Sequence, residues 1–448
     1  MFKKVLIANR GEIAMRVIRA CRELGIATVA VHSEADADAL HVRFADQAIC
    51  IGPPPPRQSY LNVPAIISAA EISAADAIHP GYGFLSENAD FAEVVENCGL
   101  TFIGPSSRAM RLWGDKVRAR EAAVEYGLPL SPGSGVLKNA EHAVAEAERV
   151  GFPIMLKARA GGGGRGMRVV TDKDKLSRAY DSATAEALGA FNSSELFLER
   201  FVARPRHIEF QAVADQHGHV WVLGERECSL QRRNQKLVEE APSPAMTPER
   251  RATMCDRIHR AVLDSGYTSL GTLEFLMDED GELYFMEMNT RVQVEHPVTE
   301  MVTGVDLVVE QIRIAAGEEL NHDDVRPWRF RGHAIECRVM AECPDSFVPW
   351  PGKITEYHPP GGAGVRVDSG IFGGFTVPAA YDSLLAKVIV TAATREQALA
   401  RMRRALSEFI IGGIRTNVAF HLRLLDDEEV REGRMTTRTV ERFMGQTK

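Results

Sequence analysis

Two glutamates on either side of a tight turn give the clearest chemical signal in the sequence. Strand-like runs at 271–277 and 282–288 flank Asp280-Gly281, and Asp-Gly is a typical two-residue hairpin turn. Counting outward from this turn places Glu274 opposite Glu287. Opposed carboxylates repel each other unless a cation lies between them, and carboxylates with room for phosphate oxygens suit Mg²⁺. The spacing therefore predicts a magnesium site. The alternatives are that both glutamates point to solvent, or that a longer turn breaks the register.

The chain beyond the hairpin continues the same alternation. Leu276 and Phe285 are expected on the carboxylate face, which argues against a purely solvated surface. If the chain stays extended, one face carries a row of polar residues, namely Glu287, Asn289, Arg291, Gln293 and Glu295. Such a face would offer metal ligands, then an arginine, then a free carboxylate.

A glycine run predicts a phosphate-binding lid. Five of the six residues from 161 to 166 are glycine, directly after a predicted strand at 152–157. Consecutive glycines let backbone N–H groups approach phosphate oxygens, and Lys157 and Arg165 add positive charge. The run matches neither the P-loop nor the dinucleotide fingerprint. The alternative is a simple flexible turn.

Two further stretches could take part in binding. The basic residues of 231–240 form either a solvated loop or an anion site. Residues 79–88 follow a predicted strand, at the end where open α/β sheets bind ligands, although a constrained turn fits equally well.

The elements that position these residues indicate an α/β protein. The first hundred residues of the 448 alternate strands and helices, which predicts a parallel sheet covered by helices. A small α+β unit is expected over about 115–202. Hairpins mix with helices from residue 207 onward. We predict four units, at 1–114, 115–202, 203–330 and 331–448.

Composition excludes several classes of protein. The net charge is −8 with no long basic run, so we expect no nucleic acid partner. No run of 18 apolar residues occurs, and the first residues do not form a signal peptide, so we expect no membrane association. Seven scattered cysteines without a C-x-x-C motif fit a reducing, cytoplasmic location. The first strand–helix turn, Asn9-Arg10-Gly11-Glu12, lacks the glycine fingerprint of nicotinamide-dependent oxidoreductases.

Taken together, these stretches resemble the biotin carboxylase family of the ATP-grasp superfamily. The match runs in order through 7–14, 79–88, Lys116, the glycine run, 231–240, 287–300, 336–338 and 381–383. The glycine run and the glutamate pair alone would indicate only an ATP-grasp protein; the specific part is the 291–295 run with Arg338. The resemblance implies an ATP-grasp fold, with its lid subdomain at 115–202 and its metal and nucleotide subdomain at 203–330. A Rossmann-like parallel-sheet domain would precede it, and a C-terminal α+β biotin carboxylase domain would follow.

The family likeness also implies a reaction, in which ATP and bicarbonate carboxylate biotin through carboxyphosphate. Glu295 would be the base that deprotonates bicarbonate, and Arg338 would stabilise the enolate-like oxygen of biotin. Bicarbonate would lie among Lys236, Arg291, Gln293 and Val294. ATP would be bound by Lys116, Lys157, Gly162, Gly163, Gly164, Gly166, Glu199, His207, Gln231 and Asn234. Two Mg²⁺, or Mn²⁺ in their place, would be held by Glu274, Glu287 and Asn289. Asn234 departs from the family's usual histidine, and we expect activity to survive because Lys236 remains.

The same likeness implies partners. The chain carries no Ala-Met-Lys-Met biotinylation sequence, so we expect a stand-alone subunit of an acetyl-CoA or other acyl-CoA carboxylase, as in fatty acid biosynthesis. The biotin carboxyl carrier protein and the carboxyltransferase would then be separate chains. Arg19, Glu23 and Arg366 match the family's homodimer interface, whereas Ala363 departs from it. The alternatives are another ATP-grasp carboxylate–amine ligase, or a non-catalytic nucleotide-binding relative.

Overall fold

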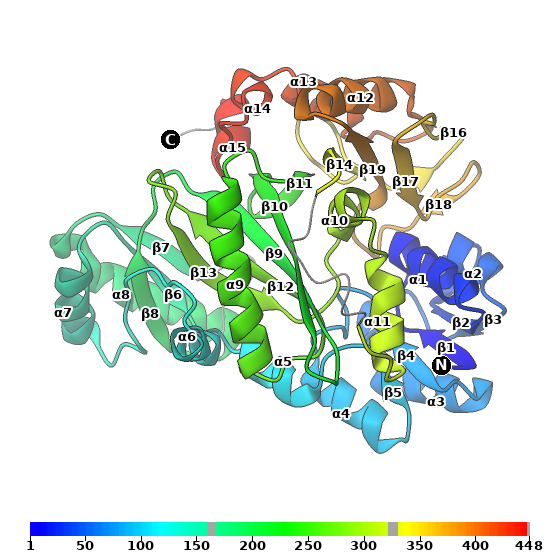
Figure 1. Cartoon of the computed structure of the whole chain (residues 1–448), viewed down its shortest axis with the longest axis horizontal. Helices are drawn as coiled ribbons and strands as arrows, with labels where there is room; N and C mark the ends of the chain where they lie inside the picture. Colours follow the sequence, from blue (N-terminus) through cyan, green and yellow to red (C-terminus); the bar gives the residue numbers. More distant parts are fainter. Residues whose placement is uncertain (160–165, 321–329, 446–448) are drawn as a thin grey trace.

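The computed structural model describes residues 1–159, 166–320 and 330–445 (Figure 1). Its first sheet is parallel, as predicted, with the strand order β3-β2-β1-β4-β5. The strands are β1 (Lys4–Ile7), β2 (Ala27–His32), β3 (Gln47–Cys50), β4 (Ala77–His79) and β5 (Thr101–Phe102). The helices between and after them are α1 (Gly11–Glu23), α2 (Leu40–Phe44), α3 (Val63–Ser73), α4 (Ala89–Asn97) and α5 (Ser107–Gly114), with short 3₁₀ turns at Glu34–Asp36 and Pro56–Gln58. In α1 the spacing of Ile13, Val17 and Cys21 buries all three, and the chain turns away at Gly25 with φ +71°.

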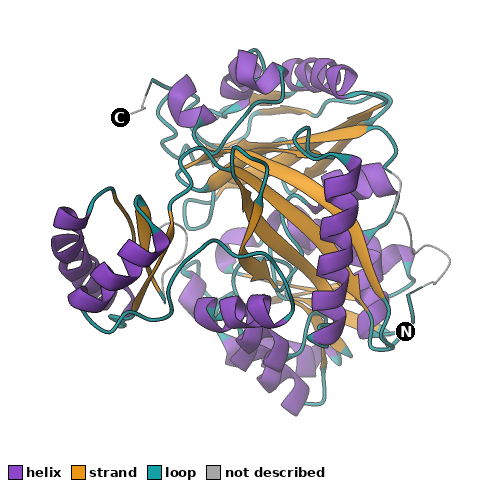
Figure 2. Ribbon diagram, turned by 60° about the vertical axis from the view of Figure 1, so that its left-hand side comes forward, coloured by secondary structure: helices purple, strands orange, loops and turns teal. Residues whose placement is uncertain are grey.

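A small antiparallel sheet follows, and its unit projects from the rest of the molecule at the left of Figures 1 and 2. Its strand order is β7-β6-β8, from β6 (Ile154–Ala158), β7 (Met167–Val170) and β8 (Leu196–Arg200). The helices α7 (Ala140–Val150) and α8 (Lys173–Phe191) cover it. The preceding helix α6 (Lys116–Glu125) buries its alanines elsewhere, against the large sheet described next.

The largest sheet has eight antiparallel strands in the order β13-β12-β9-β10-β11-β14-β19-β17. They are β9 (Arg206–Ala214), β10 (Val220–Arg232), β11 (Gln235–Ala241), β12 (Ser269–Met277), β13 (Leu283–Asn289), β14 (His333–Met340), β17 (Val365–Ser369) and β19 (Leu384–Ala392). Strands β9 to β13, from the middle of the chain, form one part of this sheet, and the C-terminal strands β14, β17 and β19 extend it beyond β11. The helix α9 (Pro248–Asp264) packs on β9 and β10, and α10 (His296–Thr303) packs on β10, β14 and β19. Helix α11 (Leu307–Ala315) lies between β12 and α1.

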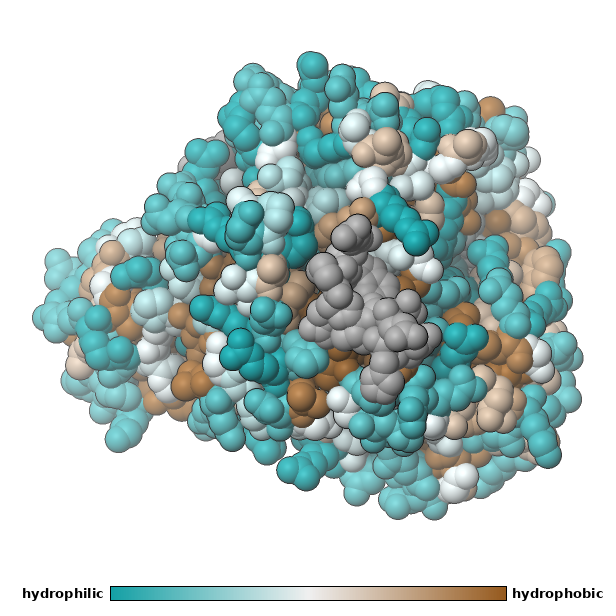
Figure 3. Space-filling model, viewed as in Figure 1, coloured by the Kyte–Doolittle hydropathy of each residue, from teal (hydrophilic) through white to brown (hydrophobic). Residues whose placement is uncertain are grey.

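The remaining elements pack around the C-terminal strands. Helix α12 (Arg395–Glu408) lies against β14 and β19, followed by α13 (Val418–Leu424), α14 (Glu428–Arg431) and α15 (Thr439–Phe443). Two small strand pairs complete the fold: β15 (Gly352–Lys353) with β18 (Thr376–Val377), and β16 (Glu356–His358) with β20 (Ile410–Gly412). Within the described ranges, no helix is both long and apolar enough to cross a membrane. On the face shown in Figure 3, hydrophilic side chains predominate and hydrophobic ones are scattered among them.

The hairpin between β12 and β13 differs from the predicted one at its turn. Met277 pairs with Leu283, so the connection is longer than the two residues expected. The Asp278 carboxylate organises it by accepting the backbone N–H groups of Asp280 and Glu282, at 3.0 and 2.9 Å. An irregularity in the register between Glu274 and Phe275 then offsets the longer turn. Glu274 therefore does lie opposite Glu287, as predicted.

The expectation for Phe285 was wrong. Because the bulge shifts the alternation, Phe285 faces Phe275 in the aromatic core, while Leu276 and Met286 line the cavity described below. The solvated-loop alternative for 231–240 describes only the turn, where residues 233–235 are exposed. This stretch is the end of β10 and most of β11, joined at Arg233 and Asn234, whose φ angles are +49° and +64°. Asparagine tolerates this left-handed conformation well.

Candidate active site

The predicted site residues meet at one cavity of about 700 Å³. The walls come from the small sheet, the large sheet and the stretch around Tyr82 in the N-terminal part. Its lining includes Lys116, Lys157, Glu199, His207, Gln231, Asn234, Lys236, Glu274, Glu287, Asn289, Arg291, Gln293, Val294, Glu295 and Arg338. Gly166, with φ +73°, precedes β7 and is not among the lining residues. The predicted glycines Gly162, Gly163 and Gly164 lie outside the described residues.

The two opposed carboxylates, Glu274 and Glu287, differ in the number of hydrogen-bond and ion-pair partners that the described residues give them. Glu274 accepts from His207 Nε2 at 2.9 Å, Asn289 Nδ2 at 2.9 Å and Gln293 Nε2 at 3.0 Å. Glu287 has one cation near it, Lys116 Nζ at 3.9 Å. Burial and the charge of Glu274 raise the pKa of Glu287, a sign of negative charge that the protein does not fully offset. This donor set of two carboxylates and an amide oxygen fits Mg²⁺.

Lys236 is the centre of a buried cluster of carboxylates. Its ammonium donates to Glu209 Oε2 at 2.6 Å, Glu274 Oε1 at 3.0 Å and Glu295 Oε1 at 2.6 Å. Burial alone would lower the pKa of Lys236, but the three carboxylates raise it well above the usual value. The lysine therefore stays charged, and it connects the predicted metal carboxylate to the predicted base.

Glu295 is held between two cations. Its second oxygen accepts from Arg338 Nη2 at 2.9 Å, and Arg338 Nε in turn donates to Glu239 Oε1 at 2.6 Å. The Glu295 side chain is buried, which would raise its pKa, but Lys236 and Arg338 outweigh burial and hold the pKa well below its usual range. The carboxylate is therefore ionised and fixed in direction.

Arg291 also lines the cavity and contacts two residues that hold Glu274, namely Asn289 and Gln293. Its guanidinium donates to Glu87 Oε2 at 2.8 Å, Gln293 Oε1 at 2.9 Å and Asn289 Oδ1 at 3.0 Å. These contacts correct the prediction of one extended face, because β13 ends at Asn289 and α10 begins at His296. Residues 290–295 form a loop in which the Arg291 guanidinium also donates to the Val292 carbonyl. The polar side chains of this loop line the cavity although the backbone is not extended.

The two predicted phosphate lysines come from different elements, Lys157 from β6 of the small sheet and Lys116 from α6, which packs on the large sheet. Lys157 and Arg120 both donate to the Glu199 carboxylate. Burial would raise the pKa of Glu199, but the two cations lower it. Lys116 opens α6 directly after its N-cap, Asp115, and reaches toward Glu287. The cavity thus brings cations and carboxylates together from Glu199 to Glu295, with Glu274 and Glu287 facing each other among them.

Sequence analysis missed three carboxylates that hold these cations: Glu209, Glu239 and Glu87. A signal for Glu209 existed, because His207, Glu209 and Gln211 alternate with apolar residues along β9. Glu239 and Glu87 lie within the stretches 231–240 and 79–88, but nothing in those stretches indicates their partners, which lie 99 and 204 residues away.

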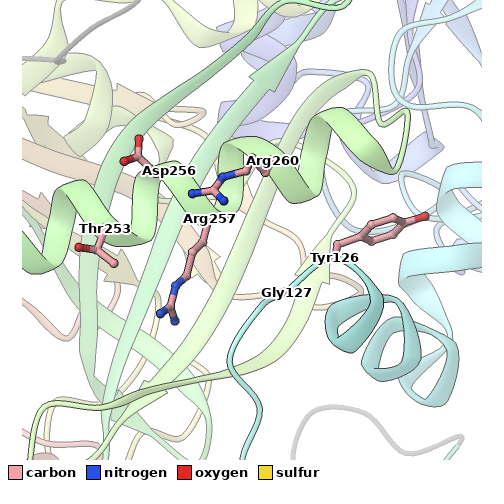
Figure 4. Close-up of a pocket in the computed structure, with 6 residues that line it drawn as sticks. All are labelled: Tyr126, Gly127, Thr253, Asp256, Arg257 and Arg260. Carbon is pink, nitrogen blue, oxygen red and sulfur yellow. The ribbon is translucent and has the colours of Figure 1, made fainter.

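A second hollow of about 580 Å³ lies between the end of α6 and α9 (Figure 4). Thr253, Asp256, Arg257 and Arg260 project from α9, across from Tyr126 and Gly127. It contains none of the predicted site residues and no carboxylate pair, so the chemistry belongs to the larger cavity.

Three family models match successive parts of the chain. Residues 1–110 match the family model "Biotin carboxylase, N-terminal domain", 115–323 match "Carbamoyl-phosphate synthase L chain, ATP binding domain", and 336–442 match "Biotin carboxylase C-terminal domain". The biotin carboxylase of Haemophilus influenzae is 54% identical over 453 residues, covering 99% of each chain. The chain belongs to the biotin carboxylase family.

Solved structures of biotin carboxylases share the fold. The biotin carboxylase–β-γ-ATP complex from Campylobacter jejuni superposes with a TM-score of 0.95 at 46% identity, covering 99% of each chain. The biotin carboxylase domain dimer of the Hydrogenobacter thermophilus 2-oxoglutarate carboxylase, in complex with MgADP, ADP and bicarbonate, has a TM-score of 0.93 at 50% identity. The match covers 99% of this chain and 98% of that one. The α/β architecture predicted from the biotin carboxylase resemblance is therefore confirmed.

Proposed function

We propose that this chain carboxylates biotin on a separate carrier protein, using ATP and bicarbonate, as the first half-reaction of an acyl-CoA carboxylase. The observation that carries the proposal is the buried Glu295 carboxylate held between Lys236 and Arg338, next to the Glu274–Glu287 pair. A fixed carboxylate among cations can deprotonate an anion that the same cations attract. A carboxylate–amine ligase would use the phosphate-binding residues but not the Glu295–Arg338 pair.

In the first step, Lys236 and Arg291 attract bicarbonate into the cluster, where Gln293 and the Val294 backbone border it. Glu295 removes its proton. An oxygen of the substrate then attacks the γ-phosphorus of ATP, forming carboxyphosphate and releasing ADP. The residues contribute mainly position and positive charge, which is what phosphoryl transfer requires.

In the second step, carboxyphosphate breaks into CO₂ and phosphate. The phosphate takes the proton of the biotin ureido nitrogen, which then attacks CO₂. Arg338 stabilises the negative oxygen that develops on the ureido group. Its guanidinium is already oriented by Glu239 at 2.6 Å, so little reorganisation is needed.

The metal and nucleotide roles follow the same likeness. Glu274, Glu287 and Asn289 would hold two Mg²⁺, which would offset the charge of the phosphate oxygens. Lys116, Lys157 and the glycine run would contact the phosphates, while Glu199, His207, Gln231 and Asn234 would border the nucleotide. The relative bound to MgADP and bicarbonate supports these ligands.

The assembly and location are proposed on similar grounds. The 2-oxoglutarate carboxylase relative is described as a dimer, and Arg19, Glu23 and Arg366 fit a family-like homodimer here. The carrier protein and the carboxyltransferase would be separate chains in the cytoplasm, and the transferase would select the acid. We also propose the division into four units, with boundaries after residues 114, 202 and 330.

The test is phosphate release from MgATP by the purified protein, measured with and without bicarbonate and free biotin. Release that requires both substrates supports the proposal. Release that ignores biotin but responds to an amine acceptor would replace it with a carboxylate–amine ligase. Tight ATP binding without any release would replace it with a non-catalytic nucleotide-binding role.

A further inference from the structure

A fully buried lysine from the C-terminal part reaches the backbone of the candidate active site. Lys387, in β19, is 0% exposed. Its ammonium donates to the carbonyl oxygen of Val294 at 2.9 Å. Val294 borders the cavity, and its carbonyl belongs to the peptide unit that leads into Glu295. The lysine thus fixes the backbone from which the proposed base projects, without entering the cavity itself.

Lys387 works beside Arg338. The two are direct cross-strand partners on β14 and β19, so their side chains leave the sheet on the same face. Arg338 contacts the Glu295 carboxylate at 2.9 Å, and Lys387 contacts the carbonyl just before that residue. Like charges in such a pair are unfavourable in themselves. Each cation has its own acceptor, which offsets this repulsion. Lys387 holds the Val294 carbonyl, and Arg338 holds the Glu295 carboxylate.

The same lysine also contacts the N-terminal part of the chain. Its ammonium lies 3.1 Å from Glu12 Oε1, and that oxygen accepts the hydroxyl of Tyr82. Tyr82 also lines the cavity. Lys387 and Glu12 therefore connect two lining residues of the cavity, Tyr82 and Val294, that lie 212 positions apart in the sequence.

The buried Lys387–Glu12 pair is not needed for the stability of the fold. Taking a lysine and a glutamate out of water is costly, and well-packed apolar residues often stabilise a fold equally well. Here Glu12 Oε2 has no hydrogen-bond partner among the described residues, so the pair is not even fully satisfied. What the pair does provide is a fixed direction for two groups of the site.

We propose that Lys387, paired with Glu12, is a positioning residue that holds the Val294–Glu295 backbone in the orientation needed for bicarbonate deprotonation. This inference rests on the proposed function. It predicts that loss of the ammonium harms the bicarbonate step while leaving nucleotide binding intact. The ammonium contacts Val294 and Glu12, whereas Lys116 and Lys157 contact other carboxylates, those of Glu287 and Glu199.

The experiment compares Lys387→Met with wild type in the phosphate-release assay. We expect kcat/KM for bicarbonate to fall on the order of 10²-fold, the usual effect of displacing a reacting group by about 1 Å. The affinity for a non-hydrolysable ATP analogue should stay within about twofold of wild type. A variant with wild-type kcat/KM for bicarbonate, or with an equal loss of nucleotide affinity, would overturn the proposal.

Two further variants separate positioning from charge balance. Arg251→Met orphans another buried carboxylate, Glu225, whose ion pair at 2.7 Å lies outside the cavity lining. It should lose stability but keep turnover per folded molecule. The double variant Lys387→Met/Glu12→Gln removes both charges of the pair. We expect its thermal stability to recover relative to Lys387→Met while kcat/KM for bicarbonate stays low; recovery of both would show that only charge balance mattered.

Failure of this inference is distinguishable from failure of the proposed function. The wild-type protein tests the function by its dependence on bicarbonate and biotin. If that dependence holds and the Lys387→Met/Glu12→Gln protein turns over like wild type, only the positioning role is refuted.

Discussion

Glu295→Gln tests the proposed base with the smallest change in shape. The amide must turn its nitrogen toward one of two cations, Lys236 or Arg338, and keeps an oxygen for the other. Both cations retain carboxylates of their own: Glu209 and Glu274 for the lysine, and Glu239 for the arginine. The variant should therefore fold with the cluster largely intact.

The expected magnitudes follow from these contacts. One charge-assisted hydrogen bond is lost, which should lower the free energy of unfolding by about 1.5–3 kcal/mol. Loss of a general base typically costs about 10²–10⁴-fold in rate. At about 1.36 kcal/mol per factor of ten, this raises the barrier by about 2.7–5.4 kcal/mol. Turnover should thus suffer more than stability.

The assay is bicarbonate-dependent phosphate release, with calorimetric titration of an ATP analogue as the second measurement. Glu225→Gln is the matched control, because Glu225 is also buried and accepts two arginine hydrogen bonds at 2.7 Å, yet lies outside the cavity lining. It should keep its turnover. Turnover of Glu295→Gln close to that of Glu225→Gln, or a large loss of analogue affinity, would refute the reasoning.

Four other outcomes are expected. Glu287→Ala should abolish phosphate release at ordinary Mg²⁺, and near-wild-type turnover in a Mg²⁺ titration would contradict the hairpin argument. Phe285→Ala should lower the free energy of unfolding by about 3–5 kcal/mol in urea, because the ring is buried among other aromatic rings. The pKa values of Glu274 and Glu295 lie below the ordinary value, so their contribution to stability is present above about pH 4.5. It should be lost as the pH falls further, and urea midpoints between pH 7 and pH 3 would show whether it is. Burial raises the pKa of Glu336, which penalises the folded state as the pH rises above 4.5, so the urea midpoint of Glu336→Gln should increasingly exceed that of wild type from pH 5 to pH 8. A difference between the two urea midpoints that stays constant from pH 5 to pH 8 would contradict the raised pKa of Glu336.

Short-range patterns predicted most of what lies close together in the sequence. The alternation in 271–289 placed Glu274 opposite Glu287, because neighbours on a hairpin keep their relation over a few residues. Beyond Asn289 the predicted alternation fails, although Glu295 still lines the same cavity. The turn itself was predicted wrongly, and the correct pairing survived because the irregular register offset the longer connection. Such compensation depends on the Asp278 side chain capturing two backbone N–H groups, which hydrophobic alternation does not report.

Long-range partners could not be predicted in this way. Glu87 meets Arg291 because the N-terminal part packs on the large sheet, and Lys387 meets Val294 because distant strands, β13 and β19, join that one sheet. The local sequence singled out some of these residues but did not predict how they pair. The parallel N-terminal sheet was predictable, since strand–helix alternation allows few other folds, but which C-terminal strand would join β11 was not.

The position of β11 within the large sheet has a consequence for synthesis on the ribosome. Its partner β14 follows only after the 91 residues from 242 to 332, so at about 5–20 residues per second the edge of β11 waits about 5–18 s for its neighbour. An unpaired edge strand invites aggregation, and inward-pointing charges are one natural protection. β11 carries Lys236, Glu239 and Glu240, charges that later serve the completed sheet. The nascent chain is thus protected by residues that its finished form uses, and the contact between Arg338 and Glu295 cannot form until β14 joins the sheet.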